Sequence, residues 1–545
     1  MTTTSTFQLK NIFTFLILLN ICTDISAQDV YMHWARVLGG TGNITAKAIA
    51  IDNNGNVYTT GSFTDTAEVD PGTGTVNLIS PDPFYGDFFV SKLNASGDYL
   101  NAYYTGGLGA QDYGSALITD AANNVFTAGY FHNSADFDPD PVDSFVLTGG
   151  IGIAFVSKFD ANNDFVWASK AGISDNLYNG IALDDSGNVY TTGKWSNDIY
   201  ISKRNAEGDT LWNKRYPPTT LNNVGNGIAV DDSGYVYVTG YYWGLSFLPN
   251  AGNTDVFVMK LDANGNLVWA KGFGGTGQDF GNSLIIDKSG GLYITGLFNS
   301  KVDFNPGTAV ADTFFLTSAG GRDVYVMKLN SNGQFQWATR AGGKLSDVGA
   351  SIAIDTAGNT YITGNFADTA AFGNSTFIST GGDDAFVAKL NASGNFIWAK
   401  QFGGDGTDAS RDVKLDASGN IFLTGYFAQT ADLDPESGVF SVTSEGLFDV
   451  FVIKLSQQPI TSIPTLTDES KIEVYPNPFS DQMTFSYSDN NQSSLSLYNF
   501  LGQQILQRTI TNSTTINTEQ LANGIYFYEL HNAKGKIKTG KVVKQ

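Results

Sequence analysis

The stretch that decides the fold is AIAIDNNGNVYTTG, residues 48–61, because the same pattern recurs along the chain. Clear copies are GIALDDSGNVYTTG (180–193), GIAVDDSGYVYVTG (227–240) and SIAIDTAGNTYITG (351–364), and weaker ones are ALITDAANNVFTAG, SLIIDKSGGLYITG and DVKLDASGNIFLTG. Each copy contains one aspartate at its fifth position, and these seven aspartates are spaced 47 to 68 residues apart: Asp52, Asp120, Asp184, Asp231, Asp287, Asp355 and Asp416. A sustained period of this kind indicates an array of similar structural units.

Each unit is expected to form four antiparallel strands. A short apolar run precedes an Asp-x-x-Gly-Asn turn, in which aspartate bonds its own backbone and glycine supplies a positive φ. A Val-Tyr-x-Thr-Gly strand follows, and then strands of the Phe-Val-x-Lys-Leu and Leu-Val-Trp-Ala-Lys types. Four strands in a unit of this length are typical of a propeller blade, whose faces are buried by its neighbours.

The two ends of the array indicate how it closes. The seventh unit stops after FVIKL (451–455), whereas HWAR (33–36) precedes the first unit and matches VWAK (268–271). We therefore predict an all-β fold with a seven-bladed β-propeller over residues 28–456, closed by the N-terminal strand, which protects the open edge. An eight-bladed ring and an open solenoid are less favoured, because neither explains the displaced strand.

The repeat resembles the SBBP-type β-propeller repeat family over roughly residues 33–456. The matching signature is the Asp-x-x-Gly-Asn-x-Tyr-x-Thr-Gly core followed by Asp-x-Phe-Val-x-Lys-Leu. The resemblance implies a secreted surface scaffold rather than an enzyme.

The N-terminal segment has the features of a secretory signal peptide. Lys10 precedes an apolar run over residues 12–21, and Ile25-Ser26-Ala27 offers a cleavage site, so residues 1–27 are expected to be removed. The run is too short for a membrane anchor, which leaves no integral membrane segment in the mature chain. Cys22 is the only cysteine, so the mature chain excludes disulfides and thiol catalysis.

The C-terminal segment forms a different unit. Residues 457–471 have linker composition, and residues 472–545 alternate apolar residues with turn dipeptides, which indicates a small β-sandwich. This unit resembles the sorting domain of type IX secretion cargo, and the motif residues are Tyr475, Pro476, Asn477, Pro478, Gly524, Tyr526 and Lys541. The resemblance implies the type IX secretion machinery as a partner, export across the outer membrane, and removal of the tail with release or surface attachment. A small accessory binding sandwich is the alternative.

The charge balance limits the partners. The chain has 31 Lys and Arg against 53 Asp and Glu, a net charge of −22. Residues 472–545 have 6 basic and 5 acidic residues, a net of +1, so residues 1–471 carry −23. Nucleic acid is excluded as a partner, because phosphate neutralisation needs clustered Lys and Arg.

No catalytic residue is predicted. The three histidines (His33, His132 and His531) are scattered, and His132 is expected in a surface loop. The aspartates and lysines that recur in each unit are expected to be structural. The aspartate caps its turn, and the lysine buries its stem between blades beside a carboxylate partner. Six tryptophans that share one position in the repeat are expected in the core: Trp34, Trp167, Trp212, Trp269, Trp337 and Trp398.

Aromatic residues that depart from the repeat are the candidate ligand-binding residues. Trp195, Tyr241, Tyr242 and Trp243 follow the motif glycines of the third and fourth units. Exposed side chains of this type stack on sugar rings or on peptide side chains, so a glycan or an extracellular protein is the expected ligand. Ordinary packing at a blade end is the alternative, and the favoured one.

Carboxylates in the second-to-third-strand connections give a weak hypothesis of a calcium site. The residues are Asp136, Asp138, Asp140, Asp303, Asp432 and Asp434. Turn formation by aspartate and proline is the favoured alternative, since none of these loops has full calcium-motif spacing.

Together these patterns predict a secreted or cell-surface propeller that acts as a non-catalytic binding, adhesion or structural module. The alternative is a secreted polysaccharide-active enzyme that uses carboxylates on the propeller loop face.

Overall fold

The computed structural model describes residues 30–457 without 83, 108–110, 141, 217–221, 307–312 and 437, and residues 472–545 without 488–492, 500–503, 511–513 and 533–534. The predicted signal peptide, with Cys22, and nearly all of the predicted linker lie outside them. The regular elements of the described residues are all β-strands, and no helix among them is long and apolar enough to cross a membrane. The chain divides into two compact units, and the division falls between residues 457 and 458.

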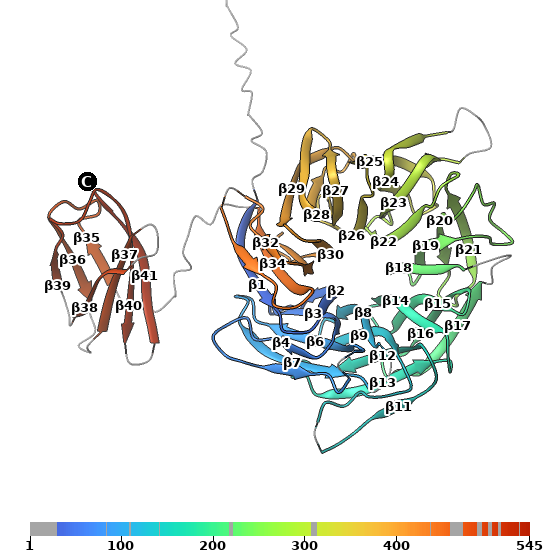
Figure 1. Cartoon of the computed structure of the whole chain (residues 1–545), viewed down its shortest axis with the longest axis horizontal. Helices are drawn as coiled ribbons and strands as arrows, with labels where there is room; N and C mark the ends of the chain where they lie inside the picture. Colours follow the sequence, from blue (N-terminus) through green and yellow to red (C-terminus); the bar gives the residue numbers. More distant parts are fainter. Residues whose placement is uncertain are drawn as a thin grey trace, which may run out of the picture. The chain divides into compact units, whose positions relative to one another are not determined.

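The first unit contains seven antiparallel four-stranded groups that follow the sequence repeat (Figure 1). Groups one to three are β2 (Ile44–Ile51), β3 (Val57–Phe63), β6 (Asp87–Leu93) and β7 (Tyr99–Thr105); β8 (Tyr113–Thr119), β9 (Val125–Phe131), β12 (Ile153–Phe159) and β13 (Phe165–Ala171); β14 (Asn176–Leu183), β15 (Val189–Trp195), β16 (Asp198–Arg204) and β17 (Thr210–Tyr216). Groups four to six are β18 (Val224–Val230), β19 (Val236–Tyr242), β20 (Asp255–Leu261) and β21 (Leu267–Phe273); β22 (Phe280–Ile286), β23 (Leu292–Asp303), β24 (Phe315–Leu329) and β25 (Phe335–Gly343); β26 (Val348–Ile354), β27 (Thr360–Phe372), β28 (Ser375–Leu390) and β29 (Phe396–Gly404).

The seventh group is assembled from both ends of the repeat array. It consists of β30 (Ala409–Leu415), β31 (Ile421–Phe427), β34 (Asp449–Ser456) and the N-terminal strand β1 (Tyr31–Leu38), and β1 pairs antiparallel with β34. Short hairpins extend three groups: β4 (Thr66–Glu68) with β5 (Asn77–Ile79), β10 (Ser134–Asp136) with β11 (Val146–Thr148), and β32 (Thr430–Asp432) with β33 (Ser441–Thr443). Pairing of β25 with β27 and of β29 with β32 joins groups five and six and this last hairpin into one larger sheet.

The predicted turn chemistry is present in every group. Asp52 Oδ1 accepts hydrogen bonds of 2.9 Å from the backbone N–H groups of Asn54 and Asn56, and the other six motif aspartates make the equivalent pair of bonds. Gly55 has a φ of +79°, and Asn123 takes the same position in the second group with a φ of +66°. The expectation that the aspartate caps its turn is thus confirmed.

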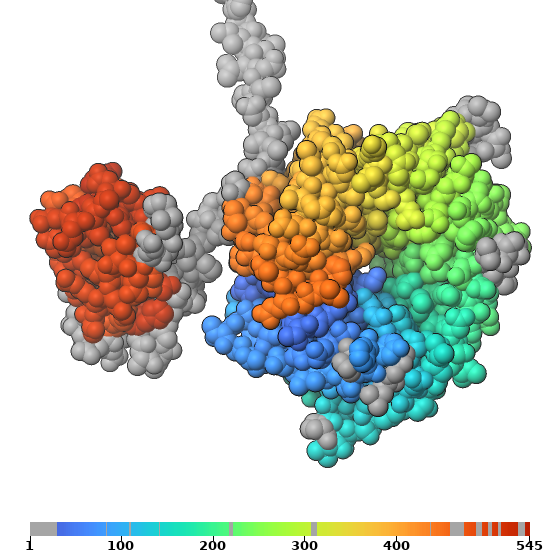
Figure 2. All heavy atoms as spheres, viewed as in Figure 1, coloured from blue at the N-terminus to red at the C-terminus, as the bar shows by residue number. Residues whose placement is uncertain are grey.

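The groups pack face to face, and the buried apolar residues lie between neighbours. One cluster joins the two ends of the array, because Trp34, Phe422 and Val452 pack there against Ile49 and Phe89 of the first group. Figure 2 shows the first group, in blue, directly beside the last, in orange. The seven innermost strands line a central cavity of about 500 Å³.

The C-terminal unit consists of two sheets around one core. One sheet has the order β35 (Ile472–Tyr475), β36 (Gln482–Tyr487), β39 (Thr514–Asn517), and the other β38 (Gln504–Ile510), β37 (Ser493–Asn499), β40 (Gly524–Asn532), β41 (Gly535–Lys544). Buried residues from both sheets, among them Phe485, Leu497 and Val542, form the core. This arrangement is the predicted small β-sandwich.

Candidate binding site

The repeated lysines share one contact, and it is with an aromatic ring. In all seven groups the ammonium lies 4.5 to 5.1 Å from the centre of the ring that follows the motif turn. An ion pair with the motif aspartate is formed in two groups, by Lys203 with Asp184 (3.6 Å) and by Lys328 with Asp287 (3.5 Å). The expected carboxylate partner is therefore found in a minority of groups, and cation–π attraction is the common feature.

The repeated tryptophans pack against the same rings. Their rings lie 6.2 to 6.5 Å from the motif aromatic residues, edge-on or tilted. Trp34 and Trp398 are buried, and the other four are half-buried. A residue that has the same role in six of the seven groups stabilises the fold and does not select a ligand.

The carboxylates of the calcium hypothesis bind their own loops. Oδ1 of Asp136, Asp303 and Asp432 each accepts two backbone N–H groups, one of them two residues further along the chain. Asp138, Asp140 and Asp434 make similar local bonds. Within the described ranges, no group of three or more His, Cys, Asp or Glu residues could hold a metal ion. These local hydrogen bonds are the ones expected for turn formation, which is the alternative that we favoured.

The four predicted aromatic residues differ in their surroundings. Tyr242 is fully buried and donates a hydrogen bond to the carbonyl of Pro249, so its inclusion in an exposed patch was wrong. Trp195, Tyr241 and Trp243 are half-buried. Trp195 packs edge-on against Tyr200, and Tyr241 stacks on Phe280 of the next group at 4.4 Å. These contacts agree with packing at the ends of strands.

A groove of about 660 Å³ is lined by residues of the first, second and third groups. Its lining includes three ring-bearing side chains, two aliphatic ones and a lysine: Tyr85, Tyr130, His132, Ile151, Leu177 and Lys194. Tyr85 is 46% exposed and Ile151 is 74% exposed. Concave sites with apolar walls and a few polar groups are the usual form of ligand sites.

His132 is the polar centre of this groove rather than a loop residue free in solvent. Its ring is mostly buried, and its Nδ1 lies 3.5 Å from Oδ1 of Asp112. The same carboxylate oxygen accepts a hydrogen bond of 2.7 Å from the backbone N–H of His132, which fixes the start of the loop. The ring packs edge-on against Tyr130 at 5.7 Å. The interpretation of His132 as a surface-loop residue was incomplete.

Backbone hydrogen bonds hold the edge of the groove. The second-to-third-strand connection of the second group and the loop that enters the third group exchange bonds: Gly150 N–H to Ile173 O, Asp175 N–H to Ile151 O, and Asn176 N–H to Gly152 O. Lys194 Nζ lies 3.7 Å from Oδ1 of Asp175 on the same edge. The site is thus preformed by the chain and places a cation next to exposed apolar surface.

Buried aspartates beside the groove belong to a repeated structural device. Asp87 and Asp112 are fully buried, burial raises the pKa of Asp87 to about 7, and the neighbouring Asp112 adds to this shift. Comparable pairs are Asp255 with Asp279, Asp323 with Asp347, and Asp384 with Asp408. Because the pairs recur at four junctions, they are poor candidates for a unique catalytic pair.

One departure from the repeat marks the groove in the sequence. In six groups the third-strand residue that pairs with the second residue after the motif glycine is an aspartate: Asp87, Asp198, Asp255, Asp323, Asp384 and Asp449. The second group has the buried Ile153 at this position, and the amide of Asn176 accepts a hydrogen bond of 2.5 Å from Ala154 N–H there. The missing carboxylate was a signal that could have drawn attention to this junction.

The sorting-motif residues meet at the ends of the C-terminal strands. The side chain of Asn477 accepts a hydrogen bond of 2.9 Å from Val543 N–H and donates one of 3.2 Å to the carbonyl of Lys541. Tyr526 is buried and donates to the carbonyl of Ala522, whereas Tyr475 is half-exposed and Lys541 exposed. Pro476 and Pro478 flank Asn477, and Gly524 begins β40. The side chain of Asn477 therefore ties the segment after the first strand of this unit to its last strand.

Comparisons with known proteins match both units. Residues 473–545 match the family model "Secretion system C-terminal sorting domain", and residues 33–62 and 336–365 match the model "Beta-propeller repeat" (SBBP). The two resemblances seen in the sequence are confirmed. The chain carries β-propeller repeats and a type IX sorting domain, and this domain indicates secretion or export to the cell surface.

Two curated relatives and one solved structure illustrate the similarity. An uncharacterized WD repeat-containing protein of Acanthamoeba polyphaga mimivirus is 26% identical over 70% of this chain and 29% of its own length. The regulatory protein FlaEY of Caulobacter vibrioides is 24% identical over 31% and 18%. The chain thus spans less than a third of either relative. The structure of a polysaccharide lyase, an ulvan lyase, is 12% identical, with 76% and 96% of the two chains covered and a TM-score of 0.42.

Proposed function

We propose that the protein is a secreted or cell-surface β-propeller with seven blades, closed by the N-terminal strand, that acts as a non-catalytic binding or adhesion module. The seven four-stranded groups and the pairing of β1 with β34 support the blade count and the closure. A hydrogen bond of 3.0 Å from Ile49 N–H in the first group to Asp412 Oδ2 in the seventh supports it further. Interaction with the type IX machinery rests on the sorting domain.

The groove around His132 carries the proposal. It combines exposed aromatic and aliphatic surface with the Lys194 cation. The second group, which contributes to the groove, has Ile153 where the other six groups have aspartate. Aromatic faces stack on sugar rings and on peptide side chains, and a lysine attracts an acidic substituent. We propose a glycan or an extracellular protein segment as the ligand, with calcium as a cofactor to be tested.

A binding screen of the mature chain against glycans and extracellular matrix proteins tests this function, with calcium and with a chelator. Tyr85 and Phe84 are neighbours in sequence, but Tyr85 alone of the two lines the groove, and Phe84 is 85% exposed. Tyr85→Ala and His132→Ala are expected to weaken binding by about tenfold, and Phe84→Ala is the matched control. A ligand that binds all three variants equally would refute the groove as the site.

A secreted polysaccharide-active enzyme is the second candidate, and the contact between His132 and Asp112 favours it. A buried carboxylate beside an imidazole can orient it as a general base. The test is incubation with acidic polysaccharides, followed by assays for new reducing ends and for unsaturated uronate products. Turnover that disappears in His132→Gln would support the enzyme, and the lack of any turnover would support the binding module.

A further inference from the structure

Each innermost strand of the first unit contains one extra residue that interrupts the strand pairing, at the same place in every repeat. Every innermost strand has a register shift against its neighbour, and the extra residue at the shift lines the central cavity. These seven residues, which we call the channel ring, are Lys47, Ser115, Asn179, Asn226, Asn282, Ala350 and Arg411. The backbone is the same in each repeat, whereas the side chains differ, so the ring breaks the symmetry of the fold.

One side of the channel ring is neutral and amide-rich. Asn179 Nδ2 donates to Asn226 Oδ1 at 3.0 Å, and Asn226 Nδ2 donates to the carbonyl of Gly281 at 2.9 Å. Asn282 Nδ2 continues the series with a bond of 2.8 Å to the carbonyl of Gly349. These amides link successive groups, and their positions are fixed by the backbone that they bind.

The other side of the channel ring is cationic. Lys47 of the first group and Arg411 of the seventh are neighbours, and no hydrogen bond or ion pair of Lys47 is present among the described residues. Arg411 donates a hydrogen bond of 2.7 Å to the hydroxyl of Tyr426 and lies over that ring at 5.0 Å, while its Nε is buried without a hydrogen-bond partner. Two cationic side chains therefore lie on this side of the cavity, although residues 1–471 carry a strongly negative net charge.

Asp412, a carboxylate that lines the cavity, already has hydrogen-bonded partners. Asp412 accepts two bonds from Lys414 Nζ (2.7 and 2.9 Å), one of 2.6 Å from Ser351 Oγ, and backbone N–H bonds that include Ile49. Lys414 and Asp412 therefore neutralise each other. Asp383 lies near Arg411 and offsets part of its charge, whereas no carboxylate contact of Lys47 is present among the described residues. The side chain of Lys47 is exposed to the cavity, where the surrounding protein atoms desolvate its ammonium and lower its pKa to about 8, and the charge of Arg411 lowers it further. An anion between the two cations would reverse this unfavourable effect.

We propose that the central cavity binds one oxyanion group, a carboxylate or a sulfate, between Lys47 and Arg411. Arg411 Nη1 makes no hydrogen bond among the described residues, and the Lys47 ammonium offers three donors. A cavity of about 500 Å³ holds one acidic monosaccharide or an acidic side chain, and the asparagine amides on the opposite side are suited to hydroxyl groups. This site is separate from the groove at His132 and does not depend on it.

Calorimetric titration of the mature chain with sulfate and with glucuronate, at constant ionic strength, tests the proposal. We expect saturable 1:1 binding of at least one probe, and which probe binds distinguishes a sulfate group from a carboxylate. Lys47→Met and Arg411→Met are each expected to weaken binding by about tenfold or more, since a hydrogen bond to a charged group is lost. Lys344→Met removes an exposed lysine outside the cavity and is the charge-matched control.

A second readout does not depend on the folding of the variants. The lowered pKa gives Lys47 a larger neutral fraction than a lysine of ordinary pKa, so an amine-acylating reagent should modify it early, and a bound probe should protect it. Mass spectrometry of the unmodified sequence measures both. Protection of Lys47 but not of Lys344 supports the site. The absence of saturable binding with both probes, or equal binding by Lys47→Met, Arg411→Met and Lys344→Met, would overturn it.

Discussion

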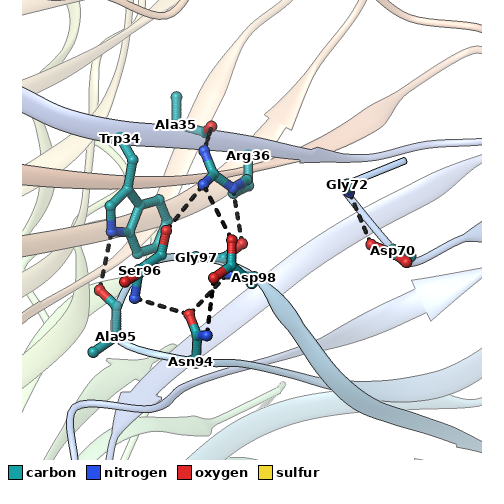
Figure 3. A network of polar contacts seen from close by, with 10 residues as sticks. All are labelled: Trp34, Ala35, Arg36, Asp70, Gly72, Asn94, Ala95, Ser96, Gly97 and Asp98. Carbon is teal, nitrogen blue, oxygen red and sulfur yellow. Dashed lines mark hydrogen bonds and ion pairs between the residues drawn. The ribbon is translucent and has the colours of Figure 1, made fainter. Parts of the chain in front are cut away.

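The indole Nε1 of Trp34 donates a hydrogen bond of 3.2 Å to the carbonyl of Ala95, although Trp34 lies on the strand that pairs with the last repeat and Ala95 belongs to the first (Figure 3). Arg36 adds bonds of 2.8 Å to the carbonyl of Gly97 and 2.9 Å to that of Ser96. The same indole-to-turn bond joins Trp167 to Ala206 and Trp212 to Ala263 inside the array. The junction between the two ends is thus built like the internal ones.

Trp34→Ala is expected to lower the free energy of unfolding by about 3 kcal/mol, because it empties a buried site and removes this hydrogen bond. Urea denaturation of the mature chain measures the change. Leu100→Ala, at a side chain that is 47% exposed on β7, is the control and should cost no more than about 0.5 kcal/mol. Equal effects of the two substitutions would contradict a stabilising junction at Trp34.

The motif tyrosine is predicted to contribute through its hydroxyl as well as its ring. Tyr190 OH donates a hydrogen bond of 2.9 Å to Asp184 Oδ2, and Lys203 lies over the ring at 4.8 Å. Tyr190→Phe should lower the free energy of unfolding by about 1 kcal/mol, since it removes only the hydroxyl. The second group has Phe126 at this position, and Phe126→Tyr offers the reverse test with Asp120 as the acceptor. Denaturant midpoints that move in the same direction for both variants would argue against the bond.

The buried carboxylates predict that stability falls as the pH rises. Burial raises the pKa of Asp279 and Asp347 from the ordinary value of 3.8 to about 7. Between these two values the folded protein binds more protons than the unfolded chain, so the stability that is present below pH 4 is lost as the pH rises through 7. The melting temperature of the mature chain should therefore be higher at pH 5 than at pH 8.

Asp347→Asn tests this assignment at one junction. Asp347 accepts backbone bonds from Gly343 and Ala367, and the corresponding residues of the third and fourth groups are Asn176 and Asn223, so asparagine is compatible with the fold. The variant should keep its stability at pH 5 and lose less stability by pH 8 than the wild type, by about 1.4 kcal/mol per pH unit for one group. An unchanged pH profile would show that Asp347 titrates at its ordinary pKa.

Local chemistry made much of the fold predictable. The turn from Asp52 to Asn56 needs only neighbouring residues, so seven copies of the motif predict seven such turns and the strands beside them. The groove was not predictable in the same way, because His132 and Ile151 lie at opposite ends of one connection of the second group and Lys194 lies in β15 of the third, so they meet only when neighbouring groups pack. The burial of Tyr242 was also missed, since the alternation of strand faces continues two residues past the motif glycine Gly240.

The first group lacks the repeated tryptophan, and this difference allows a constructive test. Asn101 pairs with Lys92 as Trp167 pairs with Lys158 and Trp212 with Lys203. At the other junctions the tryptophan ring lies against a turn glycine such as Gly208 or Gly265, where a Cβ atom would clash with it. The turn that faces Asn101 has Asn163 instead, with a φ of +70°, and Lys92 Nζ donates a hydrogen bond of 3.0 Å to the carbonyl of Ala161.

We expect Asn101→Trp alone to be destabilising, because the indole meets the side chain of Asn163 and competes with Lys92 for the carbonyl of Ala161. Asn101→Trp combined with Asn163→Gly should restore the arrangement of the other junctions and raise the free energy of unfolding by about 1–2 kcal/mol, from the additional apolar area that is buried. A double-mutant cycle in urea measures the coupling between the two sites. Additive effects would mean that the tryptophan position and the turn glycine stabilise the fold independently, which the repeated contact between them argues against.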